Sequence, residues 1–172
     1  MYSFNLLVSC PWNVHREARH EVIRLLRGIG DRNPEVGQTA AKGILGVNTS
    51  LDSHIAVREI RECCLADPSI LRFTLKWVPI DLWTNSDLIS LKEGASKLKE
   101  MIKPGERWRI TVEKRRYTAM HKLEIIKEIA SLVDEKVDLR NPDKILRIEI
   151  IGKNAGISVL HPADVLSAAK PF

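Results

Sequence analysis

The pattern of apolar and polar positions in the first half of the chain predicts six elements in the order β-α-β-β-α-β. Apolar residues run together at the start, recur at helical spacing in two stretches, and alternate in short segments between turn residues. The five stretches are Phe4–Cys10, Asn13–Gly30, Pro34–Ser50 (two strands around a turn), Ser53–Ala66 and Ile70–Trp83. This order is typical of a ferredoxin-like domain.

A second unit is predicted from residue 84 onward. Helical spacing covers Ser86–Ile102 and Thr118–Val133, and strand alternation covers Arg107–Arg116 between them. The extended pieces "KVDL", "ILRIEII" and "GISVL" close the chain. We therefore predict an α+β protein with mixed sheets and helices packed on them, divided into domains 1–83 and 84–172.

The composition fits a soluble globular protein, and its modest positive charge suits an anionic partner such as nucleic acid, although many basic proteins without such a partner have the same balance. The 172 residues are 44% hydrophobic and carry a formal net charge of +5, and no apolar run is long enough to cross a membrane. The three cysteines form no CxxC pair, and the chain shows no signal peptide, so we expect a reducing, cytoplasmic location. The histidines and cysteines show no metal-ligand spacing, so we expect neither a metal nor another cofactor.

The strongest candidate site is the basic end of the Arg107–Arg116 strand. Three cations in a row, Lys114, Arg115 and Arg116, end a strand whose alternation points Trp108 into the core. Thr118 is the expected N-cap of the next helix, whose first amides would face these cations. Arginine forks and a helix N-terminus both suit phosphate, and Tyr117 offers a ring for stacking.

A second interpretation of the same cluster stays open. The cations would then belong to a solvated surface and be neutralised by Glu106, Glu113 or Glu124. Charge runs at protein surfaces commonly have this simpler origin.

The stretch "WRITVEKRRYTAMHKLEIIKEIASLV", followed by "KVDLRNPDKILRIEIIGKNAGISVL", resembles a THUMP domain. The similar features are the strand ending in "EKRR", the helix after it, the "VDLRNPD" turn, and the "RIEI" and "GISV" strands, and they extend from about residue 84 to the C-terminus. The family places a ferredoxin-like domain before the THUMP domain, in agreement with the pattern of the first half.

The resemblance implies a tRNA-binding protein that grips the acceptor end of tRNA with both domains. The basic strand end is then the principal phosphate contact, and Lys153 and Asn154, in the loop before "GISV", are weaker candidates. The full predicted RNA-binding set is Arg107, Arg109, Lys114, Arg115, Arg116, Tyr117, Lys153 and Asn154.

The sequence contains no motif of a thiolation enzyme, a methyltransferase or a sulfur carrier, and it ends where a catalytic domain would begin. We therefore expect a non-catalytic protein that resembles the adaptor for tRNA cytidine acetylation, with tRNA and a separate acetyltransferase as partners. Two alternatives remain: the RNA-binding half of a split tRNA thiolation or methylation enzyme, and a general RNA or ribosome-assembly factor.

Two local features stay outside this assignment. The segment Gly43–Gly46 (GILG) has the spacing of an RNA-clamping loop, but its apolar middle favours a strand. Trp12 follows a proline at a strand-to-helix turn, where either a core position or an exposed position is compatible with the pattern.

Overall fold

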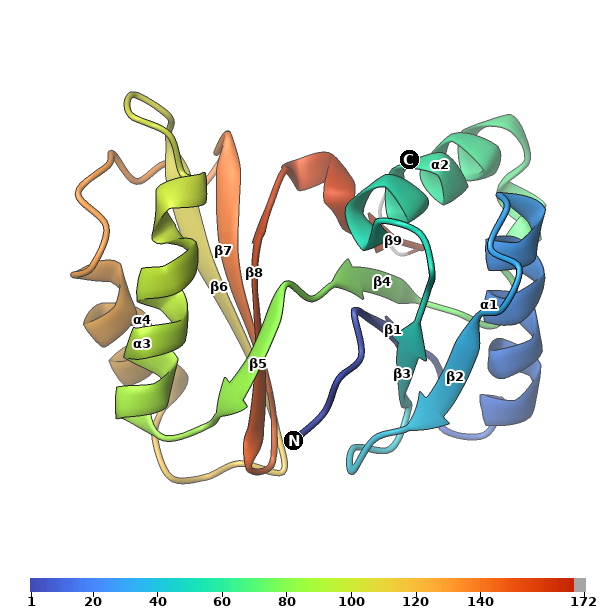
Figure 1. Ribbon diagram of the computed structural model, residues 1–172, viewed down its shortest axis with the longest axis horizontal. Helices are drawn as coiled ribbons and strands as arrows, with labels where there is room; N and C mark the ends of the chain where they lie inside the picture. The colour runs from blue at the N-terminus through green and yellow to red at the C-terminus, as the bar shows by residue number, and fades with distance from the viewer. Residues whose placement is uncertain (169–172) are drawn as a thin grey trace. The chain divides into compact units, whose positions relative to one another are not determined.

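The computed structural model describes residues 1–168, which form two compact units (Figure 1). The N-terminal unit contains Ser3–Ile80 and the segment that begins at Ala163. The C-terminal unit contains Asp81–Pro162 together with Met1 and Tyr2. The predicted division after residue 83 differs from these bounds near Ile80 and at both ends of the chain.

The N-terminal unit has the predicted β-α-β-β-α-β order, with all its strand pairs antiparallel. Its sheet has the order β2-β3-β1-β4-β9, in which the first four strands follow the ferredoxin-like arrangement. The elements are β1 (Leu6–Ser9), α1 (His15–Gly28), β2 (Glu35–Gln38), β3 (Ile44–Asn48), α2 (Ser53–Ala66), the 3-10 turn η1 (Pro68–Ile70), β4 (Lys76–Pro79) and, after a second short 3-10 turn η3 (Pro162–Asp164), β9 (Leu166–Ser167).

The two helices of this unit are held by the features that predicted them. Ala18, Val22 and Leu26 of α1 are fully buried against the sheet, as helical spacing requires. The Asp52 side chain accepts a hydrogen bond from the Ile55 amide at 3.0 Å and so caps α2. Helix α1 begins at His15, and Val14 at its N-cap position forms no side-chain cap bond.

The C-terminal unit has a four-stranded sheet of order β5-β8-β7-β6. Strands β6 and β7 are parallel and the other pairs are antiparallel. Its elements are β5 (Leu82–Asn85), α3 (Leu88–Leu98), the 3-10 turn η2 (Lys99–Met101), β6 (Trp108–Arg115), α4 (Lys122–Ala130), β7 (Lys144–Ile151) and β8 (Asn154–Leu160). The predicted α+β class is therefore confirmed.

The core of the C-terminal unit explains why β6 can carry so many charges. Trp108 and Val112 of β6 are fully buried, together with Leu91 of α3 and Ile125 and Ile129 of α4. The apolar face of the strand therefore packs under the helices, while the residues between are on the opposite face. The burial of one face fixes the register of the strand and thus the place of its basic end.

One predicted helix boundary is wrong. The helix expected from Thr118 begins at Lys122, and His121 occupies the N-cap position without a side-chain cap bond. Residues 116–121 instead form a loop in which Arg116 has a left-handed φ of 54°. Thr118 is exposed in this loop and caps nothing.

Candidate nucleic-acid interface

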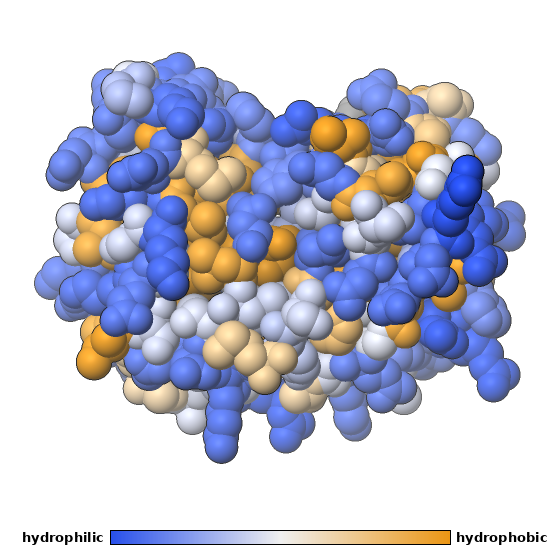
Figure 2. Space-filling model, in the orientation of Figure 1, coloured by the Kyte–Doolittle hydropathy of each residue, from blue (hydrophilic) through white to orange (hydrophobic). Residues whose placement is uncertain are grey.

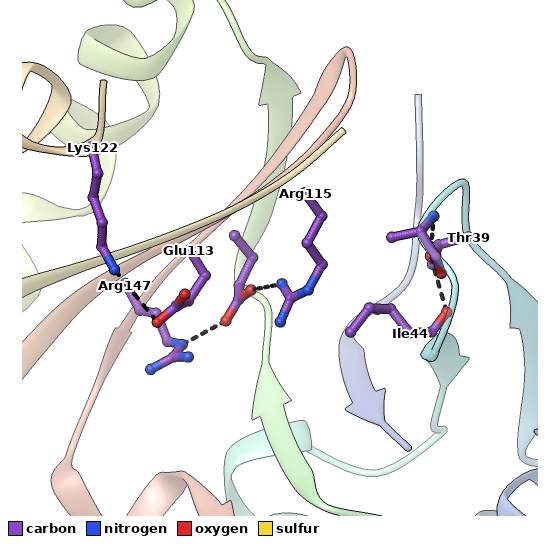
Figure 3. Close-up of polar contacts among 8 residues, drawn as sticks. Thr39, Ile44, Glu113, Arg115, Lys122 and Arg147 are labelled. Carbon is purple, nitrogen blue, oxygen red and sulfur yellow. Dashed lines mark hydrogen bonds and ion pairs between the residues drawn. The ribbon is translucent and has the colours of Figure 1, made fainter. Parts of the chain in front are cut away.

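The basic end of β6 contains one cation that is paired inside the protein. The Arg115 Nη1 atom lies 2.7 Å from Oε2 of Glu149 on β7, and the Arg147 Nε atom lies 2.7 Å from Oε1 of the same carboxylate. Glu149 and Arg147 are buried, whereas the Arg115 side chain keeps 31% of its surface exposed. Figure 3 shows this chain of contacts. Arg115 therefore has a fixed position and still reaches solvent.

Lys114 is on the other face of the strand and closes the loop after it. Its Nζ donates a hydrogen bond of 2.7 Å to the Met120 carbonyl and lies 5.7 Å from the centre of the Tyr117 ring. The Tyr117 hydroxyl donates to the Ser86 carbonyl at 3.0 Å. Burial, followed by the nearby charge of Asp87, raises the pKa of Tyr117. Lys114 and Tyr117 therefore hold the loop in shape, and the ring is only partly available for stacking.

Arg116 is exposed, and the structure gives its guanidinium no carboxylate partner within residues 1–168. The β7–β8 turn lies beside it. The Gly152 amide donates to the Arg115 carbonyl at 2.9 Å, and a Cβ on Gly152 would lie 3.9 Å from the Arg116 carbonyl oxygen. Lys153, the next residue in this turn, is also exposed. We call Arg115, Arg116 and Lys153 the basic rim.

Lys122, at the first position of α4, is a further cation close to this end of the sheet. Its Nζ lies 3.8 Å from Oε1 of Glu113, and both side chains are well exposed (Figure 3). Exposed pairs of this kind contribute little to stability, so they separate readily when a stronger anion arrives. The sequence suggested three carboxylates as neutralising partners. Glu113 pairs with Lys122 and Glu106 pairs with Lys144, whereas Glu124 is exposed and forms no ion pair within residues 1–168. None of the three is paired with the rim.

Arg107 immediately precedes β6 and Arg109 is the second residue of the strand, so both lie at the opposite end of β6 from the rim. Arg107 Nη1 lies 3.0 Å from Oδ2 of Asp138, and Arg109 Nη1 donates to the Leu139 carbonyl at 3.2 Å. The amides of Asn141 and Arg140, followed by the Arg107 charge, lower the pKa of Asp138. Both arginines therefore hold the "VDLRNPD" turn.

Asn154 is next to the rim but is occupied locally. Its Oδ1 accepts a hydrogen bond from the Tyr2 amide at 3.2 Å. The backbone of the preceding residue is fixed as well, since the Lys153 carbonyl accepts from the Ser86 amide at 3.1 Å. The turn that presents Lys153 is therefore anchored on two sides.

Glu149 and Arg147 are the residues that the sequence interpretation missed. Their closeness to the basic strand end follows only from the parallel pairing of β7 with β6. This pairing sets Glu149 opposite Glu113 and Arg147 opposite Thr111. Side chains on adjacent parallel strands then meet on the polar face. Because that register depends on a long-range pairing, the pattern of a single strand does not reveal it.

The described residues contain neither a group of three or more potential metal ligands nor a helix long and apolar enough to span a membrane. The face of the molecule in Figure 2 is mostly hydrophilic, with hydrophobic residues exposed in places between the polar ones. At the carboxyl end of β6 the C-terminal unit thus presents one held arginine, Arg115, and two exposed cations on anchored backbone, Arg116 and Lys153, a combination that suits phosphate oxygens.

The C-terminal unit is a THUMP domain: the THUMP family model matches residues 85–160. The chain thus contains a THUMP domain, and its N-terminal unit has the ferredoxin-like order of elements. The matched range contains the whole basic rim as well as Arg107 and Arg109. A search of the curated proteins found no match to the sequence.

Solved structures share this architecture at low sequence identity. PH1313 from Pyrococcus horikoshii superposes with a TM-score of 0.61 at 17% identity over 91% of this chain and 54% of its own. TrmN from Thermus thermophilus gives 0.62 at 15% identity, over 90% and 44% of the two chains. A 4-thiouridine synthetase, solved with RNA and ATP, gives 0.57 at 16% identity, over 96% and 42%. The present chain thus spans about half the length of the structures it matches, and the likeness shows the fold alone.

Proposed function

We propose that this protein binds tRNA and takes part in tRNA modification, with the basic rim as a phosphate contact. The observation that carries this proposal is the coincidence of the rim with a THUMP domain, an RNA-binding module. Arg116 and Lys153 are exposed cations on anchored backbone, so little conformational freedom is lost when they meet phosphate. The 4-thiouridine synthetase, which has the same fold, was solved with RNA bound.

Arg115 has a distinct role in this proposal. Glu149 occupies one side of its guanidinium, and the remaining N–H groups are available to a phosphate. Because Glu149 also binds buried Arg147, its charge is shared between two cations. The Arg115–Glu149–Arg147 chain therefore keeps a net positive charge toward the solvent.

The more specific role that we propose is that of an adaptor. The protein grips the acceptor end of tRNA and presents it to a separate enzyme, a tRNA cytidine acetyltransferase, without performing chemistry itself. This role rests on the family resemblance of the sequence. The alternatives are the RNA-binding half of a split thiolation or methylation enzyme and a ribosome-assembly factor, which differ in the partner and in the RNA.

Crosslinking in cells tests the RNA partner directly. We expect ultraviolet crosslinking followed by RNA sequencing to recover tRNA, and mass spectrometry to place the crosslinked peptides at residues 114–117 and 152–154. Recovery of ribosomal RNA in place of tRNA would contradict the proposal and favour the assembly factor.

Copurification tests the enzyme partner. An acetyltransferase that copurifies with the chain would support the adaptor role. A thiolation or methylation enzyme would contradict that role and support the split-enzyme alternative.

A further inference from the structure

Trp12 differs from the other three tryptophans because its ring is left in solvent. Trp77 and Trp108 are fully buried, and Trp83 packs edge-on against Tyr2 at 5.2 Å. Trp12 is 76% exposed, although a tryptophan gains more from burial than most side chains. It lies in the turn between β1 and α1, where the Val14 amide donates to the Pro11 carbonyl at 3.2 Å. The fold therefore displays this ring.

The exposed ring borders a cavity within the N-terminal unit. The β1–α1 turn and the β2–β3 turn border an open cavity of about 280 Å³, whose lining includes Trp12, His15, Gln38, Thr39, Lys42 and Gly43. Pockets that bury drug-sized ligands occupy about 300–1,000 Å³, so this cavity suits one flat ring. None of its lining residues carries a carboxylate.

The β2–β3 turn, which lines the cavity together with Trp12, is held by its own contacts. The Thr39 hydroxyl oxygen accepts from the Ala41 amide at 3.2 Å, and the hydroxyl donates to the Ile44 carbonyl at 2.9 Å (Figure 3). Gly43 has a φ of +75°, and a Cβ there would lie 2.6 Å from the Cys10 carbonyl oxygen, so the turn packs closely on the end of β1. A preformed wall lowers the entropic cost of binding a ligand.

We propose that this cavity binds one unpaired nucleotide of the RNA, whose base stacks on Trp12 while Lys42 contacts an adjoining phosphate. This inference rests on the proposed RNA-binding function and adds a second contact, in the ferredoxin-like domain. Aromatic rings bind splayed bases by stacking, and bases in a duplex are not available for it. Gln38 supplies an amide that both donates and accepts hydrogen bonds, as the edge of a base requires.

The surroundings of Trp12 favour RNA over a protein partner. Tryptophans that anchor protein interfaces occupy the centre of a desolvated patch with few charges. Here the neighbours are an exposed lysine, a histidine and a glutamine, and Arg16 is exposed one residue beyond His15. Cations interleaved with an aromatic ring are the usual composition of a single-strand binding surface.

Two RNA hairpins with equal stems and the same compact tetraloop, whose bases stack on one another within the loop, test the inference. One has a single-stranded 3′ tail and the other is blunt. Fluorescence anisotropy measures their affinities for the wild-type chain, Trp12→Ala, Trp12→Phe and the control Leu75→Ala, which removes another exposed side chain from the same unit. Because stacking of one base is worth on the order of tenfold or more in affinity, we expect Trp12→Ala to weaken the tailed hairpin by about tenfold and Trp12→Phe by much less. The blunt hairpin should change little with either variant.

The outcomes separate this inference from the proposed function. If Trp12→Ala binds the tailed hairpin as tightly as the wild type, or weakens both hairpins alike, the nucleotide pocket is refuted while RNA binding through the rim stands. If the wild-type chain binds neither hairpin, both proposals fail. A protein captured through Trp12, with unchanged RNA affinity, would likewise overturn the assignment of a base to this cavity.

Discussion

Replacing Glu149 by alanine is expected to destabilise the protein by about 3–5 kcal/mol, because it leaves the buried Arg147 without its anionic partner. Within residues 1–168, the Arg147 Nη2 atom is also buried without a hydrogen-bond partner, so Glu149 is the carboxylate that balances this guanidinium. Chemical denaturation of the wild type and the variant measures the loss. The expected loss is a large share of the roughly 5–15 kcal/mol by which natural domains are stable.

A second variant separates the missing charge from the missing side chain. Replacing the buried pair together, as Arg147→Met with Glu149→Leu, removes both charges from the interior and should cost much less than Glu149→Ala alone. An equal loss in the two variants would mean that Glu149 acts by packing. A loss below about 1 kcal/mol in Glu149→Ala would show that Arg147 is solvated, in disagreement with the structure.

Reversing the two exposed charges of the rim, as Arg116→Glu with Lys153→Glu, is expected to weaken tRNA binding by about 100-fold or more. The variant loses two charge-assisted contacts, each worth about 1.5–3 kcal/mol, and sets two carboxylates against phosphate. Both side chains are exposed. The backbone hydrogen bonds that anchor the turn, to the Arg115 and Lys153 carbonyls, do not involve the replaced side chains. The fold should therefore survive, and circular dichroism checks that it does.

A matched variant controls for net charge. Lys97 is near the end of α3 and Lys103 follows η2, so both are at the opposite end of α3 from the rim, and both are exposed. The variant Lys97→Glu with Lys103→Glu has the same net charge as the rim variant and should weaken binding much less. An equal loss in both variants would mean that tRNA responds only to the overall charge of the protein.

The parts of the fold that the sequence predicts well are those set by local patterns. Helix α2 begins at Ser53 after an aspartate cap and ends at Ala66 before a proline, as predicted. The alternation in β6 placed Trp108 and Val112 in the core, and the GILG segment forms a strand from Ile44 onward. In each case, the residues that determine the element are neighbours in the sequence, so the local pattern is sufficient to predict it.

The start of α4 was predicted wrongly because tertiary contacts override a good local cap. Thr118 has the residue type of an N-cap, but the chain around it is fixed by the bond from Lys114 to the Met120 carbonyl and by the left-handed Arg116. The loop that results moves the first turn of α4 to Lys122. The sequence suggested a phosphate site in which a helix begins directly after the cations. In the structure, the candidate site instead consists of cations at the end of β6 and in the β7–β8 turn.

The candidate site shows the same division between local and long-range information. The run of three cations is visible in the sequence, yet each has a different environment: Lys114 binds a carbonyl, Arg115 binds Glu149 and Arg116 is exposed. Only the pairing of β6 with β7 and the turn into β8 bring Lys153 beside Arg116. Strand β9, which follows the THUMP domain in sequence and pairs with β4, likewise depends on a pairing across most of the chain.

The salt dependence of tRNA binding tests the central claim most directly. If the rim contacts phosphate, log K should fall linearly with log salt for the wild-type chain, and Arg116→Ala with Lys153→Ala should flatten that slope by about 2, since each phosphate contact contributes close to 1. The charge-matched variant Lys97→Ala with Lys103→Ala should retain the wild-type slope. An unchanged slope in the folded rim variant would show that the strand end and its neighbouring turn do not touch the RNA backbone.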